Sequence, residues 1–168
     1  MTIAQLNVAD RATFVAQLGF AFEDSPWIAD AAWERRPFAD AGALHAAMLA
    51  VLADAPEERR VALIAAHPDL AGRGAREGRL TPASSAEQSA AGLDRLSPEE
   101  VERFDALNGA YRARFGFPFV ICAREHTTSS ILAALAARAS NDRTTEISAA
   151  LAEIGKIARL RLRDAVTG

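Results

Sequence analysis

The chain is organised around a helical run that ends in a short polar break, residues 57–72, EERRVALIAAHPDLAG. Proline disfavours the α conformation in the residue before it, so the helix is predicted to end near His67. His67 follows Leu63 by four residues and Ile64 by three, so it is expected on the same inward face. A helix C-terminus also favours the imidazolium form of a histidine. This placement suits proton transfer, although the same pattern fits a core or C-capping histidine.

The composition is typical of a soluble globular protein and argues against several kinds of partner. Half of the 168 residues are hydrophobic and 24% are charged, with a formal net charge of −3 at pH 7. Charges of both signs are interspersed along the chain, which argues against a nucleic acid or an anionic membrane as the main partner. The longest uncharged run, residues 41–53, is too short to span a bilayer.

The cysteine and histidine content predicts a cytoplasmic protein without a metal site. Cys122 is the only cysteine, so no internal disulfide can form, which fits a reducing compartment. The first residues lack the basic start and apolar core of a signal peptide. The three histidines show no paired spacing and there is no cysteine cluster, which argues against a bound metal.

Helical periodicity dominates the chain and strand alternation is nearly absent. Gly116 and Pro118 must interrupt a helix, so a buried extended connection is expected around residues 116–123. We find no internal repeat and no low-complexity linker. The prediction is an all-α, single-domain multi-helix bundle over residues 1–168, with that one extended connection.

The segment Ser84-Ser85-Ala86-Glu87-Gln88 has two interpretations. Ser84 and Glu87 have the S-x-x-E spacing of a helix capping box, which requires no further function. However, the residues behind them are small, so a ligand or another backbone could approach closely. Free amides and two hydroxyls at a helix N-terminus also form an anion site. The pattern alone leaves both interpretations open.

The extended connection also has two interpretations. The backbone groups of residues 119–123 lie outside any predicted helix and need hydrogen-bond partners when buried. A planar ligand with several ring N–H and C=O groups would supply them, and a neighbouring segment of the chain would do so equally well.

The last predicted helix contains an arginine on its apolar side. The apolar stripe consists of Ile147, Leu151, Ile154 and Ala158. Arg161 falls within about 40° of that stripe, whereas Arg159 and Arg163 fall well outside it. An inward arginine needs a carboxylate, which either an internal Asp or Glu or a ligand would supply.

Short motifs along the chain, taken together and in their order, resemble those of the 2-oxo-4-hydroxy-4-carboxy-5-ureidoimidazoline (OHCU) decarboxylases of urate breakdown. The matching segments are Ser25-Pro26-Trp27, Arg36-Pro37-Phe38, residues 67–72, residues 84–88, Ala91-Gly92-Leu93, Asn108, Tyr111, residues 115–122 and residues 157–162. The resemblance implies an all-helical, cofactor-free decarboxylase, typically a homodimer, that makes (S)-allantoin. No fused hydrolase domain is present, so the stand-alone form is expected.

The resemblance also implies roles for individual residues. It implies that His67 and Glu87 are catalytic and that Pro68 lines the substrate. It implies that Arg161 pairs with an anionic group of the substrate. The other implied substrate-binding residues are Ser84, Ser85, Ala86, Gln88, Phe119, Val120, Ile121, Cys122 and Ala123. The expected partner is then a small ureidoimidazoline substrate. The rival interpretations are a hydrolase with His67 as base and a non-catalytic helical module that binds a small anion or a protein.

Overall fold

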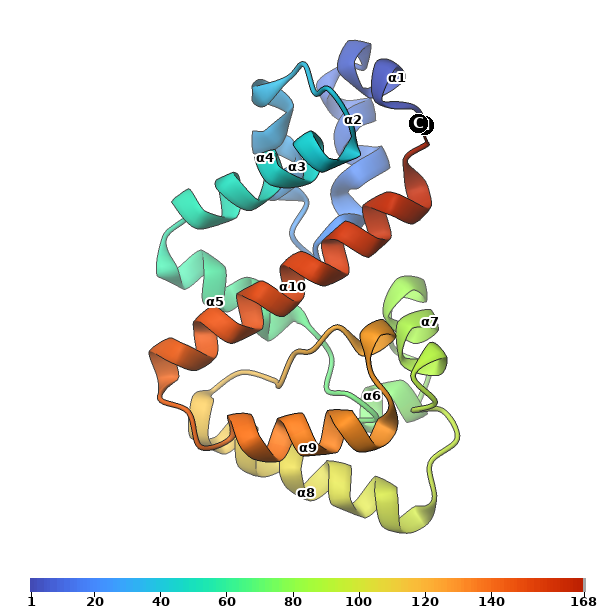
Figure 1. Cartoon of the computed structure of the whole chain (residues 1–168), viewed down its shortest axis with the longest axis vertical. Coiled ribbons are helices and arrows are strands. Elements are labelled where there is room, and N and C mark those ends of the chain that lie inside the picture. The colour runs from blue at the N-terminus through green and yellow to red at the C-terminus, as the bar shows by residue number, and fades with distance from the viewer. Residues whose placement is uncertain (168) are drawn as a thin grey trace. The chain divides into compact units, whose positions relative to one another are not determined.

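The computed structural model describes residues 1–167, and most of them are helical (Figure 1). Over these residues the chain forms α-helices and short 3₁₀ helices, and the β pairing is one isolated bridge between Thr2 and Thr167. The all-α prediction is therefore confirmed. Gly168, the last residue of the predicted domain, lies outside the described residues.

The chain divides into two compact units. Unit 1 contains Met1–Ala66 and the chain from Gly155 onward, and unit 2 contains His67–Ile154. Unit 1 therefore takes residues from both ends of the sequence, and the last helix, α10 (Arg143–Ala165), contributes to both units. The prediction of a single domain over residues 1–168 stays a prediction.

Unit 1 is built from helices that begin at polar capping residues and bury one apolar side. Its elements are α1 (Ile3–Val8), α2 (Arg11–Leu18), η1 (Gly19–Ala21), α3 (Pro26–Ala32), η2 (Trp33–Arg35), α4 (Ala41–Asp54), α5 (Glu57–Ala66) and the later part of α10. Asp10 caps α2 by accepting a hydrogen bond from the Thr13 amide at 2.7 Å, which satisfies a backbone donor without a helical partner. Helix α3 packs against α2 and α4, and buried side chains of all three helices, among them Phe14, Ile28 and Leu44, contribute to the core of the unit.

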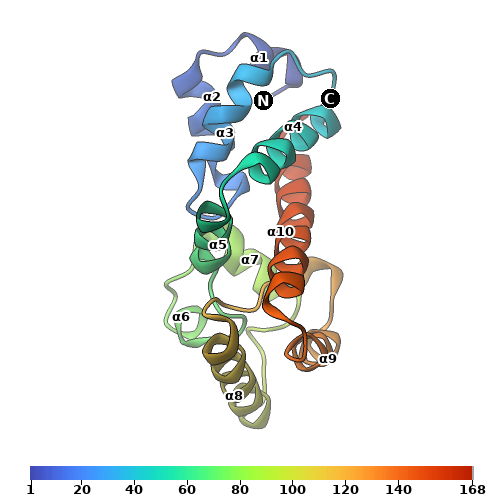
Figure 2. The ribbon, with the colours of Figure 1, turned by 90° about the vertical axis from the view of Figure 1, so that its left-hand side faces the viewer.

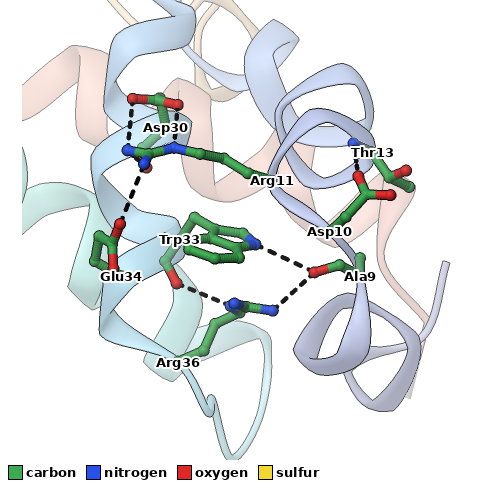
Figure 3. A network of polar contacts seen from close by, with 8 residues as sticks. All are labelled: Ala9, Asp10, Arg11, Thr13, Asp30, Trp33, Glu34 and Arg36. Atoms are coloured by element: carbon green, nitrogen blue, oxygen red, sulfur yellow. Dashed lines mark hydrogen bonds and ion pairs between the residues drawn. The ribbon is translucent and has the colours of Figure 1, made fainter.

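A polar network fixes the start of unit 1 against the turn that follows α3 (Figure 3). The Arg36 guanidinium lies 3.9 Å from the centroid of the Trp33 ring. Arg36 Nη1 and Trp33 Nε1 both donate to the Ala9 carbonyl, at 2.8 and 3.2 Å. Arg11 makes a two-pronged contact with the carboxylate of Asp30. These contacts explain the Arg36-Pro37-Phe38 motif as part of a structural frame.

Unit 2 contains the segments to which the sequence assigns chemistry. Its elements are α6 (Arg73–Arg76), α7 (Pro82–Ala90), α8 (Pro98–Phe115), η3 (Ala123–Glu125), α9 (Thr128–Arg138) and the first part of α10. Helix α8 begins at a capping box formed by Ser97 and Glu100, and it ends at Gly116, which has the left-handed φ of 80°. A connection with η3 as its only helix joins α8 to α9 (Figures 1 and 2). Residues 117–123 are all buried, so the predicted buried connection is confirmed over most of residues 116–123. Gly116 is exposed, and Ala123 already belongs to η3.

Candidate active site

His67 is buried at the first residue of unit 2, directly after α5. Only 6% of the residue is exposed, and Leu63 and Ile64 of the preceding turns are also buried. The helix ends at Ala66, as the proline at position 68 predicts. The predicted inward orientation of His67 is therefore confirmed.

The loop that follows His67, residues 68–72, makes a tight turn. Its Ala71 has a positive φ of 52°, which residues with a Cβ rarely adopt. A Cβ added at Gly72 would lie 2.7 Å from the Cβ of Asp69, so only glycine fits there without a shift of the loop. A conformation of this kind persists only where the surrounding structure holds it.

Gln88 of α7 holds this loop with both ends of its amide. Its Oε1 accepts a hydrogen bond from the Ala71 amide at 2.9 Å, and its Nε2 donates to the Asp69 carbonyl at 3.4 Å. The Gln88 side chain is buried, with 6% of the residue exposed. Gln88 therefore positions the loop of residues 68–72, which follows His67. This role does not depend on whether Gln88 also binds a ligand.

Helix α8 provides two further anchors for the same loop. The buried Asn108 donates from Nδ2 to the Leu70 carbonyl at 2.9 Å. Arg112 donates from Nη2 to the Asp69 carboxylate, also at 2.9 Å. Because His67 is joined covalently to this loop, anchors on consecutive loop residues restrict where its imidazole can lie.

A fourth anchoring side chain comes from α6. Arg76 Nη1 donates to the Ala71 carbonyl at 2.7 Å, while the same guanidinium binds the carboxylate of Asp105. Sequence reasoning missed Arg76 and Arg112 because nothing distinguishes them from other surface charges. Asn108 carried a signal, since it is a polar residue on the otherwise aromatic buried stripe of α8, formed by Phe104, Tyr111 and Phe115.

Helix α7 contains five of the predicted site residues, Ser84 to Gln88. It begins at Pro82, so Ser84 lies inside the helix and is not its N-cap. Thr81 is the N-cap, and its hydroxyl accepts a hydrogen bond from the Ser84 amide at 3.3 Å. The capping-box interpretation of Ser84 and Glu87 is therefore wrong, because both lie inside the helix. The Thr81-Pro82 pair is itself an N-cap and N1 signal.

The burial pattern divides these α7 residues between two faces. Ser84 and Gln88, one helical turn apart, are buried, and Glu87 is half-buried. Ser85 and Ala86 are exposed. The inward side of α7 therefore presents a hydroxyl, an amide and part of a carboxylate.

A cavity of about 470 Å³ lies beside the loop that follows His67. Its wall includes Ala71 from that loop and Ser85 and Gln88 from α7. The polar groups of Arg76 and Asp94 also line it. A volume of this size accommodates a small-molecule ligand.

The backbone of residues 119–123 finds partners within unit 2. The Val120 carbonyl accepts a hydrogen bond from Arg138 Nη1 at 2.8 Å. The Cys122 amide donates to Glu153 Oε2 at 2.9 Å. Of the two interpretations of this segment, a neighbouring part of the chain therefore accounts for these two groups.

Two of the predicted substrate-binding segments lie next to each other. Helix α7 packs against η3, which begins at Ala123. The Thr128 hydroxyl donates to the Ala91 carbonyl at 3.3 Å, which ties the end of α7 to the start of α9. Because Gln88 also holds the loop after His67, unit 2 brings together the His67, α7 and 119–123 segments.

Arg161 belongs to unit 1 and pairs with an internal carboxylate. Its Nη1 donates to Glu23 Oε2 at 3.0 Å and to the Phe20 carbonyl at 3.1 Å. Both charged side chains are only 4% exposed. Arg159 and Arg163 are exposed, so the predicted orientations of these arginines are confirmed. Binding of a substrate anion by Arg161 stays a prediction.

Among residues 1–167, no three His, Cys, Asp or Glu side chains gather in a group that could hold a metal ion. Over the same residues, no helix is both long and apolar enough to cross a membrane.

Comparison with known proteins places these features in one family. The OHCU decarboxylase family model matches residues 7–163. A 2-oxo-4-hydroxy-4-carboxy-5-ureidoimidazoline decarboxylase of Haloferax volcanii is 41% identical over 164 residues, covering 98% of this chain and 95% of the relative. The uric acid degradation bifunctional protein PucL of Bacillus subtilis is 39% identical over 166 residues, covering 99% of this chain and 33% of PucL.

Solved structures agree with this assignment. A crystal structure of (S)-allantoin synthase superposes with a TM-score of 0.80 at 30% identity, covering 99% of this chain and 54% of that chain, so the protein spans about half of it. A crystal structure of OHCU decarboxylase in the presence of (S)-allantoin has a TM-score of 0.70 at 22% identity and covers 93% of this chain and 97% of that chain, which shows a shared fold. The chain belongs to the OHCU decarboxylase family.

Proposed function

We propose that this protein decarboxylates OHCU to (S)-allantoin without a metal or an organic cofactor. The observation that carries the proposal is the buried His67 beside a loop whose residues Asp69, Leu70 and Ala71 are each anchored by side chains of unit 2. A proton-transfer group must be held in one position to act on one face of a substrate.

The chemistry of the substrate explains why no cofactor is required. The carboxylate leaves as CO₂ from the hydroxyl-bearing carbon next to a C=N bond. The electron pair left behind forms a C=C bond to the imine carbon, and the C=N π electrons move onto the ring nitrogen, which takes up a proton. The hydroxyl then loses its proton and becomes a carbonyl, while a proton adds to the former imine carbon, which becomes the stereocentre of allantoin. The protein has to hold the carboxylate perpendicular to the ring π-system, stabilise the charge developing on nitrogen, and deliver the proton to one face.

The residues of unit 2 divide these tasks between them. His67 and Glu87 carry the proton transfers. The α7 residues from Ser84 to Gln88, Pro68 and the backbone of residues 119–123 fix the ring and ureido groups. The inward side of α7, with the buried Ser84 and Gln88, and the packing of α7 against η3 support this placement of the substrate.

Stereochemistry is the decisive test of this function. The substrate also loses CO₂ spontaneously, so total allantoin is a poor measure and the excess of the (S) form is the informative one. Freshly generated product of urate oxidation is mixed with the protein, and circular dichroism and CO₂ release are followed. We expect wild-type protein to give excess (S)-allantoin and a folded His67→Asn variant to give the racemate.

A matched control and two contrary outcomes complete the experiment. His45→Gln changes a half-buried histidine of α4 in unit 1 and should retain the (S) excess. Turnover without CO₂ release would indicate hydrolysis with His67 as base. An (S) excess from folded His67→Asn would mean that His67 is structural.

We also propose that the protein works in the cytoplasm as a homodimer. The single cysteine, Cys122, is buried and has no second cysteine in the chain for a disulfide, which supports a reducing compartment. The resemblance to the decarboxylase family supports the dimer. Light scattering of the purified protein measures the mass directly, and a monomeric mass at working concentrations would overturn that part of the proposal.

A further inference from the structure

A buried ionic network lies against the extended connection of unit 2. Glu146 of α10 is 0% exposed, and its carboxylate accepts hydrogen bonds from three side chains. Arg138 Nε donates to Oε1 at 2.8 Å, Asn141 Nδ2 donates to Oε2 at 2.9 Å, and the Tyr111 hydroxyl also donates to Oε1. A buried carboxylate requires such pairing because burial removes its hydration.

Arg138 connects this network to the extended connection. One side of its guanidinium binds Glu146, while Nη1 donates to the Val120 carbonyl at 2.8 Å. The guanidinium also lies 4.5 Å from the centroid of the Phe119 ring. The planar fork of arginine makes all of these contacts at once, which the single ammonium group of a lysine cannot do.

Tyr111 adds a second connection from α8. Its ring meets the Phe119 ring edge-on, with centroids 5.4 Å apart. Burial, reinforced by the hydrogen bond to the Glu146 carboxylate, raises the pKa of the Tyr111 phenol, so the hydroxyl remains a donor. Phe119 is thus held between an aromatic ring and a cation, and both of these bind Glu146.

We propose that Arg138 is a positioning residue for the decarboxylation. Its guanidinium fixes the carbonyl of Val120 and the ring of Phe119. Glu146 binds Arg138 and holds it in place, and Tyr111 in turn binds Glu146. This inference rests on the proposed function, because that function assigns residues 119–123 to substrate binding. A core ion pair alone would require only that Glu146 be neutralised, whereas the Val120 and Phe119 contacts extend to the binding segment.

Arg138→Lys separates these two roles, since lysine keeps the positive charge near Glu146 but loses the fork. We expect KM for the substrate to rise about tenfold or more, with kcat much less affected, because the variant shifts groups that bind the substrate. Hydrogen exchange at the amides of residues 119–122 should become faster. This second measurement does not depend on activity.

Asn141→Ala is the matched control. It removes a hydrogen bond from the same Glu146 carboxylate and leaves the Arg138 contacts with Val120 and Phe119 in place. We expect a lowered melting temperature, with KM and the exchange of residues 119–122 unchanged. An Arg138→Lys variant that matches Asn141→Ala in KM and in exchange would overturn the inference.

Two further outcomes remain decisive. Should Arg138→Lys fail to fold, Tyr111→Phe takes its place, because it keeps the ring packing and removes only the hydroxyl donor. For Tyr111→Phe, a rise in KM smaller than the one expected for Arg138→Lys supports the inference, and an unchanged KM contradicts it. Absence of turnover by wild-type protein would overturn the proposed function instead, and the exchange data would then decide the positioning role of Arg138.

Discussion

Arg159, Arg161 and Arg163 of α10 differ in their exposure to solvent, because the helix period turns only Arg161 inward. Arg161 is 4% exposed and binds Glu23, whereas Arg159 and Arg163 are exposed. A buried ion pair contributes little net stability, because both charges lose their hydration. The loss of one partner is costly, however, because the other charge then remains buried without compensation.

Arg161→Gln should therefore lower the free energy of unfolding by about 3–5 kcal/mol. Arg159→Gln and Arg163→Gln, the exposed controls, should change it by no more than about 0.5 kcal/mol. Urea denaturation of the three variants measures these differences. If Arg161→Gln keeps wild-type stability but loses activity, the arginine acts on a substrate anion instead.

Tyr111, the only tyrosine of the chain, allows a pH prediction. Its pKa is raised in the folded protein, so the folded state keeps a proton that the unfolded chain loses above about pH 10. Tyr111 thus contributes stability that is complete below that pH and is lost as the pH rises through the folded-state pKa. We expect tyrosinate absorbance to appear only together with unfolding. Tyrosinate in a folded protein near pH 10 would contradict this.

At the scale of elements, the loop of residues 68–72 and the helices around it act as one structure. Side chains from α6, α7 and α8 bind the backbone of this loop or the carboxylate of Asp69. Most of these anchors bind backbone groups, so their effect depends on the loop keeping its conformation. A change that alters the turn should therefore affect catalysis as well as stability.

Gly72→Ala tests this dependence. The added methyl group would lie 2.7 Å from the Asp69 Cβ, so the turn has to shift at a cost of about 1–3 kcal/mol. We expect a lower melting temperature and a loss of the (S) excess. Gly109→Ala is the control, since this exposed glycine of α8 has open space around it. It should stabilise the protein by about 0.5–1 kcal/mol and keep activity.

At the scale of the whole molecule, the family match over residues 7–163 includes parts of both units. His67 and Glu87, to which the resemblance assigns catalysis, both lie in unit 2.

Exhaustive chelation tests the cofactor-free chemistry of the whole protein. Because the substrate carries its own electron acceptor, dialysis against a strong chelator should leave both the rate and the (S) excess unchanged. The rate of CO₂ release before and after dialysis is the measurement. Activity that disappears and returns with one specific divalent ion would contradict the cofactor-free reaction.

Local physical rules were sufficient for much of the fold and for part of the site. The proline at position 68 ends α5, and the glycine at position 116 ends α8. The same helical period places His67 inward and separates Arg161 from its neighbours. The exception was the capping box at Ser84, where S-x-x-E spacing occurred inside a helix that begins at Thr81.

The sequence by itself therefore determined the helical class of the fold, the helix breaks near Pro68 and Gly116, and the inward faces of His67 and Arg161. It did not predict the short helix α6, which lies in a stretch whose composition is typical of a flexible charged loop. Only the tertiary structure decided what the inward side chains meet. Arg161 pairs with Glu23, 138 residues away, and Asn108 binds Leu70, 38 residues away. Periodicity defines a face of one helix but contains no information on which distant segment covers that face. Partners far apart in sequence are therefore decided by packing, as are the anchors of the loop after His67.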